Sequence, residues 1–377
     1  MEEIPMVDLK TQYHRLKSEI DSAVLKVLES TAFIKGPEVK KFESNLAAYL
    51  GAKHVIGCAN GTDALQIAMM ALGYQPGDEV ITASFTYIAT AEVIALLRLK
   101  PVLVEVNKDT FTIDPAAIEA AITPKTRAIV PVHLFGQAAD MEAIMKIAAK
   151  YNLDVIEDNA QAIGADYIFA DGARKKLGTI GTVGCTSFFP SKNLGAYGDG
   201  GALYTDNDAL AAKIKKIANH GQSSLYIHDE VGVNSRLDTI QAAVLDVKLK
   251  YLNDFAASRQ QAADYYDAAF KDLKHIQTPV RAPWSTHVFH QYTVILNNMN
   301  RDEVQKKLAA KGISSKVYYP IPVHLQKAYA DERYHSGAFP ITESLAGSVL
   351  SLPIHTEFTK EQLKYIVESF CSIIQSL

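Results

Sequence analysis

Two stretches of the chain indicate which fold the sequence encodes. Residues 154–161 read DVIEDNAQ, and residues 183–195 read VGCTSFFPSKNLG. Each begins as a short apolar run of strand length and then turns polar, which is typical of a strand that ends in a loop at the edge of a sheet. The second loop carries Lys192 and leads directly to the apolar run 201–205. We therefore expect an antiparallel pair among the last strands.

Similar apolar runs alternate with amphipathic helical segments on the N-terminal side of these stretches, after two opening helices at 13–31 and 39–50. This alternation predicts an α/β fold with a mostly parallel sheet covered by helices on both faces. The predicted strands are 54–58, 79–82, 100–106, 126–132, 154–157, 183–188 and 201–205, and the predicted helices are 61–72, 89–97, 115–122, 141–151 and 208–217.

The C-terminal third predicts a second, smaller α/β unit. Because 377 residues are too many for one ordinary hydrophobic core, we expect two domains. A long helical segment at 237–270 is predicted to join them. We expect a large domain over 1–250 and a small domain over 251–377. The predicted strands of the small domain are 288–295 and 314–319, and its predicted helices are 301–311 and 360–374.

Composition excludes several classes of function. The net charge of −4 leaves no basic surface for nucleic acid or an anionic membrane, and no apolar run reaches the roughly 18 residues that span a bilayer. Three widely spaced cysteines (Cys58, Cys185 and Cys371) indicate a reducing compartment, so we expect a cytoplasmic protein. No cluster has the spacing of metal ligands, and no strand is followed by the glycine pattern of nicotinamide-binding folds.

Two loops near the N-terminus place polar or aromatic groups at the edge of the predicted sheet, where ligands bind in folds of this kind. Residues 59–63 read ANGTD, and Gly61 allows a tight turn before a helix whose first amides can hold an anion. An ordinary helix cap is the alternative. Residues 84–87 read SFTY and bring Tyr87 to the same edge, although an aromatic there is also typical of a core.

Asp158 and Lys192 are the two charged candidates at this edge. An acid after a buried strand needs a cationic partner, which a pyridinium nitrogen or a buried Arg or Lys provides. A lysine between Pro190 and Gly195 in an apolar setting can have its pKa lowered, which suits Schiff-base chemistry. The alternative for Lys192 is a solvated surface charge.

The order of these features resembles that of pyridoxal-phosphate enzymes of fold type I. It is similar in particular to the DegT/DnrJ/EryC1/StrS family of sugar aminotransferases, from residue 33 to residue 320. The resemblance depends on four runs, which are NGTDAL at 60–65, EDNAQ at 157–161, SFFPSK at 187–192 and GVNSRLD at 232–238.

The resemblance implies a role for each residue around the cofactor ring. Lys192 is implied as the Schiff-base lysine and as the acid and base that moves the substrate proton. Asp158 would pair with the ring nitrogen, so that the ring works as an electron sink. Gln161 would contact the side of the ring that carries the 3-hydroxyl, and Tyr87 would stack on the ring face.

The cofactor phosphate is implied to bind Gly61, Thr62 and Ser187. Asn234 would join them from a second subunit, so the resemblance implies a homodimer with shared sites. A turn residue that caps a helix is the alternative for Asn234.

Four residues are implied as substrate contacts. Arg236 could pair with a sugar carboxylate. Tyr318 stands where many relatives have His, and Tyr319 would lie near the sugar. His324 would line the same pocket, or face solvent as a loop histidine.

The implied reaction takes an amino group from L-glutamate, releases 2-oxoglutarate and passes through pyridoxamine phosphate. Because dehydratase relatives carry His in place of Lys192, the resemblance favours transamination over dehydration. The amino-acid sequences of 58–67 and 232–239 are similar to those of enzymes that aminate UDP-2-acetamido-2-deoxy-3-oxo-D-glucuronate. Those enzymes supply bacterial surface polysaccharide such as O-antigen. The alternatives are a dTDP-3-keto-6-deoxyhexose 3-aminotransferase and, from another class, a non-catalytic regulator on the same fold.

Overall fold

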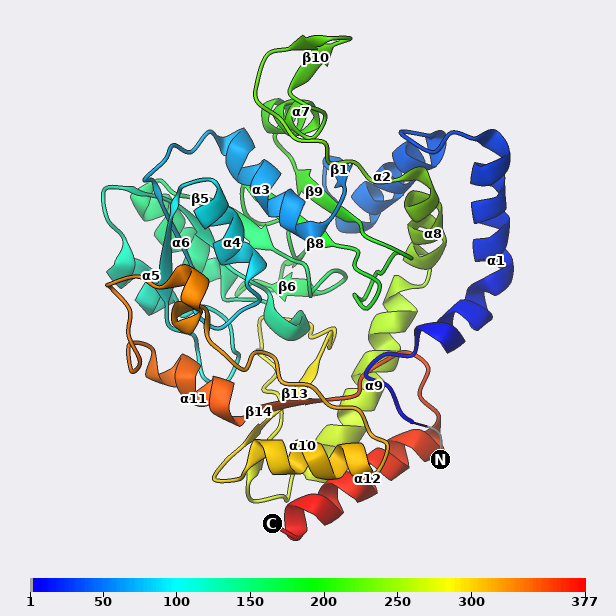
Figure 1. The fold of residues 1–377 in the computed structure, drawn as a ribbon, viewed down its shortest axis with the longest axis vertical. Helices are drawn as coiled ribbons and strands as arrows, with labels where there is room; N and C mark the ends of the chain where they lie inside the picture. Colours follow the sequence, from blue (N-terminus) through cyan, green and yellow to red (C-terminus); the bar gives the residue numbers. More distant parts are fainter. Residues whose placement is uncertain (1–2) are drawn as a thin grey trace.

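A seven-stranded sheet lies at the centre of the computed structural model, which describes residues 3–377 (Figure 1). The strand order is β1-β9-β8-β5-β4-β2-β3, and only β9 runs antiparallel to its neighbours. The predicted mostly parallel α/β fold and the predicted antiparallel pair are therefore confirmed. The strands are β1 (His54–Cys58), β2 (Glu79–Ala83), β3 (Lys100–Val104), β4 (Thr126–Val130), β5 (Asp154–Asp158), β8 (Val183–Ser187) and β9 (Gly201–Thr205).

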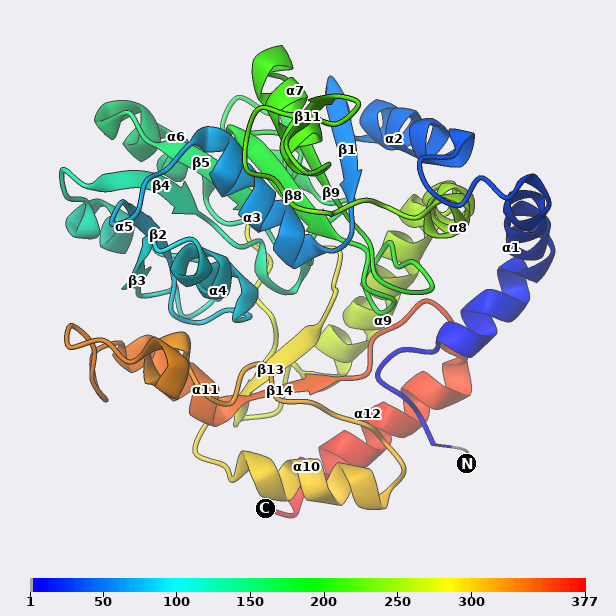
Figure 2. The ribbon, with the colours of Figure 1, turned by 45° about the horizontal axis from the view of Figure 1, so that its top comes forward.

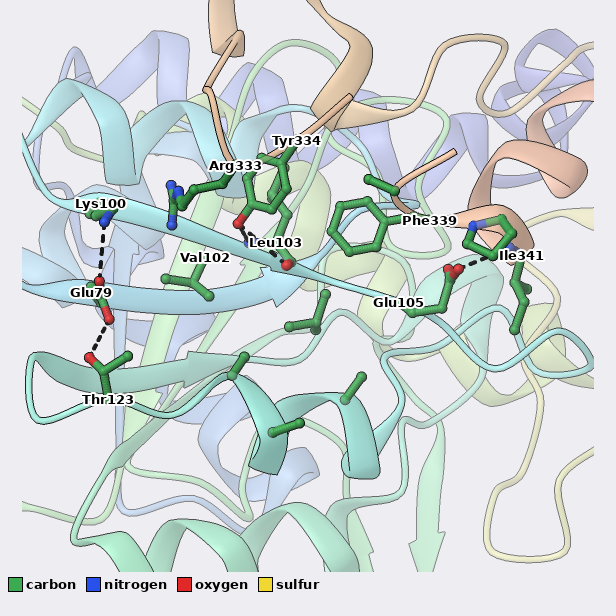
Figure 3. A pocket seen from close by; sticks show the side chains of 16 residues that line it. Glu79, Lys100, Val102, Leu103, Glu105, Thr123, Arg333, Tyr334, Phe339 and Ile341 are labelled. Carbon is green, nitrogen blue, oxygen red and sulfur yellow. Dashed lines mark hydrogen bonds and ion pairs between the residues drawn. The ribbon is translucent and has the colours of Figure 1, made fainter. Parts of the chain in front are cut away.

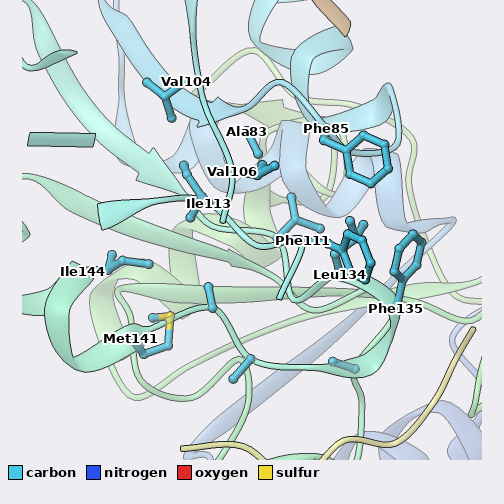
Figure 4. Packing of buried hydrophobic residues seen from close by; sticks show 14 of the residues in the cluster. Ala83, Phe85, Val104, Val106, Phe111, Ile113, Leu134, Phe135, Met141 and Ile144 are labelled. Carbon is cyan, nitrogen blue, oxygen red and sulfur yellow. The ribbon is translucent and has the colours of Figure 1, made fainter. Parts of the chain in front are cut away.

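Helices cover both faces of this sheet (Figure 2). Successive strand side chains point to opposite faces, so Val80 packs into one apolar cluster and Ile81 into the other. The cluster around Ile81 contains the aromatic rings of Phe85, Phe111 and Phe135 (Figure 4). The covering helices are α3 (Gly61–Leu72), α4 (Ala89–Leu96), α5 (Pro115–Ala121), α6 (Met141–Tyr151) and α7 (Asp208–Ile217).

The helix predicted over 237–270 is two helices, and that prediction is wrong at its middle. α8 (Thr239–Leu249) ends before Lys250 and Tyr251, and α9 (Leu252–Phe270) starts after them. The break lets α8 pack against α1 (Leu9–Ser30) and α2 (Pro37–Leu50) while α9 continues to the second sheet (Figure 1).

The second sheet is antiparallel and contains β12 (Ile276–Gln277), β13 (Tyr292–Leu296) and β14 (Val349–Leu352). The strand predicted at 288–295 begins only at Tyr292. The carbonyls of Phe289 and His290 accept hydrogen bonds from Arg259 and not from a neighbouring strand. The segment predicted as a strand at 314–319 makes only a bridge between Lys316 and Ser351. The helices around this sheet are α10 (Arg301–Ala310), α11 (Pro340–Ser348) and α12 (Lys360–Gln375).

The chain start also contacts this C-terminal part, since Ile4 pairs with Ile313. The division at residue 250 stays a prediction. Within residues 3–377, no helix combines the length and the apolar character that crossing a membrane requires. The remaining short elements are β6 (Asp166–Ile168), β7 (Arg174–Lys176), β10 (Gln222–Ser224), β11 (Ile227–His228), η1 (Leu134–Gly136), η2 (Val323–Leu325) and η3 (Lys327–Tyr329).

Candidate active site

The carboxyl ends of the parallel strands meet at one edge of the large sheet, as expected for ligand sites in such folds. The register shows this directly, because Cys58 and Ser187 both lie opposite Gly201. Asp158, the last residue of β5, lies opposite Cys185. The loops that follow β1, β5 and β8 therefore start side by side.

Gly61 and Ser187 form one corner of this edge. A Cβ atom on Gly61 would lie 2.6 Å from the Cβ of Ser187, so only glycine allows the two segments to approach this closely. Asn60 caps α3 by accepting a hydrogen bond from the amide of Asp63 at 2.8 Å. The first amides of a helix have no partners within the helix, so this corner offers donors to an anion at Gly61 and Thr62.

Asp158 is a buried carboxylate whose hydrogen-bond donors are neutral groups. Its side chain is 6 % exposed, and it accepts hydrogen bonds from the Thr90 hydroxyl at 2.8 Å and from the Ala160 amide at 3.1 Å. Among residues 3–377, no Lys, Arg or His forms an ion pair with it. A direct ion pair with a buried Arg or Lys is therefore not found, although the charge of Lys192 acts on Asp158 from a distance, and the carboxylate is available to a cationic ligand.

The preceding residue, Glu157, is just as buried but has all its partners within the protein. Its carboxylate accepts hydrogen bonds from the amides of Gly178, Ile180 and Gly181 at 2.6–2.7 Å. It also lies 2.9 Å from Nε2 of His133. His133 and Glu157 thus hold the loop around Gly178 in place, which makes His133 an internal histidine.

Lys192 lies in a closed loop after β8. Its amide donates a hydrogen bond to the Phe189 carbonyl at 2.8 Å, and the Asn193 side chain donates one to the Val288 carbonyl at 2.9 Å. Burial lowers the pKa of Lys192 to about 8, although the negative charge of Asp158 opposes this shift. This shift agrees with the apolar setting of the loop in the sequence, and it keeps a usable fraction of the amine uncharged near neutral pH.

Gln161, Tyr319 and Tyr87 border the same region. Gln161 accepts a hydrogen bond from the Phe135 amide at 2.7 Å and donates one to the Tyr319 hydroxyl at 3.0 Å. The rings of Tyr87 and Tyr319 are 6.0 Å apart, and Tyr87 is 55 % exposed. Burial raises the pKa of the Tyr319 phenol, so this hydroxyl stays protonated.

His324 does not present a free nitrogen to this region. It is 3 % exposed, its Nδ1 lies 2.7 Å from the Ser84 hydroxyl and its Nε2 lies 3.0 Å from Glu343. Both ring nitrogens are thus taken by internal partners, and the residue ties η2 to the loop after β2. The expectation that His324 lines the substrate pocket or faces solvent therefore finds no support in this geometry. Tyr318 is half-buried beside Gln291, and burial raises its pKa.

Asn234 and Arg236 belong to the segment that passes beside the end of β1. Asn234 is exposed, whereas the adjacent Ser235 is buried and accepts a hydrogen bond from the Ala59 amide at 3.0 Å. Arg236 lines a cavity of about 390 Å³ together with Lys40 and other basic side chains, and Lys192 is not among the residues that line it.

Two residues near the site carry no signal in the sequence. Thr90, at the start of α4, reaches Asp158 only because the fold brings the two elements together. His290 lies near Lys192 with a buried Nδ1 that has no hydrogen-bond partner, and burial holds its pKa well below the usual value, aided by the charges of Lys192 and Arg259. A buried unpaired atom can be recognised only from coordinates.

A second cavity, of about 730 Å³, runs along the edge strand β3 (Figure 3). Its polar groups are paired with one another. Glu79 lies 3.4 Å from Lys100, and Glu105 accepts hydrogen bonds from the Ile341 and Thr342 amides at 2.9 and 3.0 Å. None of the predicted site residues lines this cavity.

Comparison with known proteins agrees with this geometry. The model of the DegT/DnrJ/EryC1/StrS aminotransferase family matches residues 14–371. A UDP-2-acetamido-2-deoxy-3-oxo-D-glucuronate aminotransferase of Pseudomonas aeruginosa is 49 % identical over 96 % of this chain and 98 % of its own length. A pleiotropic regulatory protein of Geobacillus stearothermophilus is also 49 % identical, over 97 % of both chains.

A dTDP-3-amino-3,4,6-trideoxy-alpha-D-glucose transaminase of Streptomyces venezuelae is 42 % identical over 97 % of this chain and 95 % of its own length. Among solved structures, S. venezuelae DesV in complex with a ketimine intermediate superposes with a TM-score of 0.95. The two sequences are 41 % identical, and the superposition covers 100 % of each chain.

Proposed function

We propose that this chain, which belongs to the DegT/DnrJ/EryC1/StrS aminotransferase family, moves an amino group from L-glutamate to C3 of UDP-2-acetamido-2-deoxy-3-oxo-D-glucuronate. The chain is an aminotransferase, and its cofactor is pyridoxal 5′-phosphate. The observation that carries the proposal is a buried Asp158 without a cation, in the same region as a Lys192 whose pKa is lowered to about 8.

The residues present fit this cofactor. A protonated pyridine nitrogen supplies the missing cation for Asp158, and an aldehyde is the natural partner of the partly uncharged amine of Lys192. The corner at Gly61 and Ser187 leaves no room for an additional side chain, and it offers helix amides to a phosphate.

Bound pyridoxal phosphate supplies an electron sink for the reaction. Lys192 would hold the cofactor through its amine and then move the proton at the substrate carbon. Asp158 would keep the ring nitrogen protonated, and the hydroxyl of Thr90 orients the carboxylate for this contact. Gln161 would approach the 3-hydroxyl side of the ring and Tyr87 would stack on the ring face, while Tyr319, which is hydrogen-bonded to Gln161, would lie near the sugar.

The UDP-linked 3-oxo-uronate is favoured by the 49 % identical aminotransferase of Pseudomonas aeruginosa. Its carboxylate suits the guanidinium of Arg236, which can form two parallel hydrogen bonds. The dTDP-linked 3-keto-6-deoxyhexose remains the second candidate, because a transaminase named for a dTDP amino sugar is 42 % identical. A product of the first kind would enter bacterial surface polysaccharide such as O-antigen.

A non-catalytic regulator is the candidate from another class, and one relative carries such a name. A regulator does not require a buried carboxylate without a cation or a lysine with a lowered pKa. Both features lower the stability of a protein that binds no ligand at these groups. Asp158 and Lys192 therefore favour an enzyme over a non-catalytic regulator.

A homodimer with shared sites is part of the proposal. Asn234 is exposed, and it would reach the phosphate corner of the partner, together with Arg236 on the same segment. The hairpin of β10 and β11 projects from the large domain (Figure 1), and the apolar side chains that it and the following residues expose would pack on a second copy. These side chains are Leu225, Tyr226, Ile227 and Val231. We place this dimer in the cytoplasm.

Two assays test the proposal. The first compares the UDP-linked 3-oxo-uronate with a dTDP-linked 3-keto-6-deoxyhexose, each with glutamate, and we expect turnover of the first sugar. Turnover of the dTDP sugar alone would overturn the proposed substrate. A wild-type protein that shows no absorbance of bound cofactor after reconstitution with pyridoxal phosphate would overturn the proposal that the chain is an enzyme.

The second assay mixes Lys192→Ala with Asn234→Ala and allows the subunits to exchange. Shared sites predict that activity returns in the hybrid dimer, because one of its two sites keeps both residues. Activity that stays absent after exchange has been demonstrated would contradict shared sites.

A further inference from the structure

Lys248 on α8 is a buried lysine without an anionic partner. Its side chain is among the largest that are fully buried, and the residue is 1 % exposed. Among residues 3–377 it forms no ion pair. Lysine heads normally remain in water, so a buried ammonium costs stability unless its contacts compensate.

The contacts of Lys248 lie on the segment that follows Lys192. Its Nζ donates a hydrogen bond to the Gly195 carbonyl at 2.6 Å and lies 5.2 Å from the ring centroid of Tyr197. A hydrogen bond from an ammonium is roughly twice as strong as one between neutral groups. The ammonium thus fixes the end of the loop that carries Lys192.

The two ends of the loop that carries Lys192 lie against each other, so the position of Gly195 affects the position of Lys192. A Cβ on Gly195 would lie 2.2 Å from the Pro190 carbonyl oxygen, which shows how closely the two ends approach. The Ala196 amide donates a hydrogen bond to the Phe188 carbonyl at 2.8 Å, and the Lys192 amide donates one to Phe189. A shift of Gly195 therefore moves the backbone of Lys192.

A second buried cation, Arg259, contacts the segment to which Asn193 is hydrogen-bonded. Arg259 on α9 donates hydrogen bonds to the carbonyls of Phe289 and His290, next to the Val288 carbonyl that receives Asn193. The charge of Arg259 and, above all, burial lower the pKa of Lys248 to about 8. The fold thus keeps two costly cations behind one loop.

We propose that Lys248 is a positioning residue that holds the Gly195 carbonyl and thereby aims the amine of Lys192 at the cofactor. The groups that face its ammonium are the Gly195 carbonyl, the Tyr197 ring and the charge of Arg259. The inference rests on the proposed function of Lys192.

The test measures how fast the full-length enzyme forms its borohydride-reducible linkage with pyridoxal phosphate. Lys248→Met keeps the length and apolar stem of the side chain but removes the charge, and Lys248→Arg keeps a charged donor. We expect Lys248→Met to form the linkage at least tenfold more slowly and to show a shifted pH profile of cofactor absorbance. Lys248→Arg should restore the rate at least in part.

The matched control is Lys250→Met, just beyond the same helix, because Lys250 is exposed and pairs with Glu19 on the surface. We expect this variant to behave as wild type. A Lys248→Met enzyme with the wild-type rate and absorbance profile would overturn the inference. Should Lys248→Met be recovered unfolded, Lys248→Gln takes its place under the same criteria. Failure of the wild type to form the linkage would instead count against the proposed function.

Discussion

The cavity along β3 and the region at the ends of β5 and β8 differ in how their charges are satisfied. Along β3, Glu79 meets Lys100 and Glu105 receives the first amides of α11 (Figure 3). At the ends of β5 and β8, Asp158 is buried without a cation and Lys192 has a lowered pKa. The β3 cavity measures about 730 Å³, yet the carboxylates that line it have partners within the chain. A buried charge that the protein leaves unpaired is therefore a better sign of chemistry than the volume of a cavity.

Removing the amine of Lys192 is the strongest way to test this contrast. We expect Lys192→Ala to lose the absorbance of the bound cofactor linkage and to lower transamination from glutamate by roughly a thousandfold or more, since the group that bonds the cofactor and moves the proton is gone. Spectra of the reconstituted protein and an amino-transfer assay measure both effects. The control is Lys100→Ala in the β3 cavity, which should retain wild-type turnover.

Neutralising Asp158 should have the next largest effect. Removing one partner of a buried ion pair costs about 3–5 kcal/mol, so Asp158→Asn should lower kcat by roughly a hundredfold to several thousandfold. Steady-state kinetics with glutamate measures the loss. Glu105→Gln, a matched change in the β3 cavity, should leave kcat unchanged. Equal kcat losses in the two variants would contradict the contrast between the regions.

The pH dependence of cofactor capture should follow the pKa of Lys192. The uncharged amine is the nucleophile, so capture by the apoenzyme accelerates as pH rises through the lowered pKa of about 8 and then levels off. Between pH 7 and pH 9 the uncharged fraction rises about tenfold. Stopped-flow absorbance measures the rate. A capture rate that keeps rising beyond pH 10 would show that the pKa of Lys192 is not lowered.

The smallest effect belongs to the β3 cavity, where the polar groups serve stability. Glu105→Ala removes the acceptor for the amides of Ile341 and Thr342 at the start of α11. The loss of such a cap costs about 0.5–2 kcal/mol, so thermal unfolding should shift to lower temperature. Turnover at low temperature should remain that of the wild type. A large loss of turnover would connect this cavity with the active site.

The sequence predicted most of what depends on local pattern. Strand bounds at 54–58 and 201–205 agree with β1 and β9, and the helix at 61–72 agrees with α3, because periodicity and turn residues are local signals. It also predicted the lowered pKa of Lys192, since a lysine within an apolar loop is desolvated. The break at Lys250 was not predicted, because packing of α8 and α9 on different partners causes it.

The sequence by itself determined the order of the chemical groups, from the turn at Gly61 through Asp158 to the lysine at 192. Only the tertiary structure decided which of them lack a partner. Glu157 and Asp158 are adjacent acids with the same local signal, yet Glu157 accepts hydrogen bonds from three backbone amides, whereas Asp158 forms no ion pair among residues 3–377. The structure also gave His324 two internal partners and brought Lys248 to the Gly195 carbonyl. Partners of a buried charge come from distant parts of the chain, and a local pattern does not contain them.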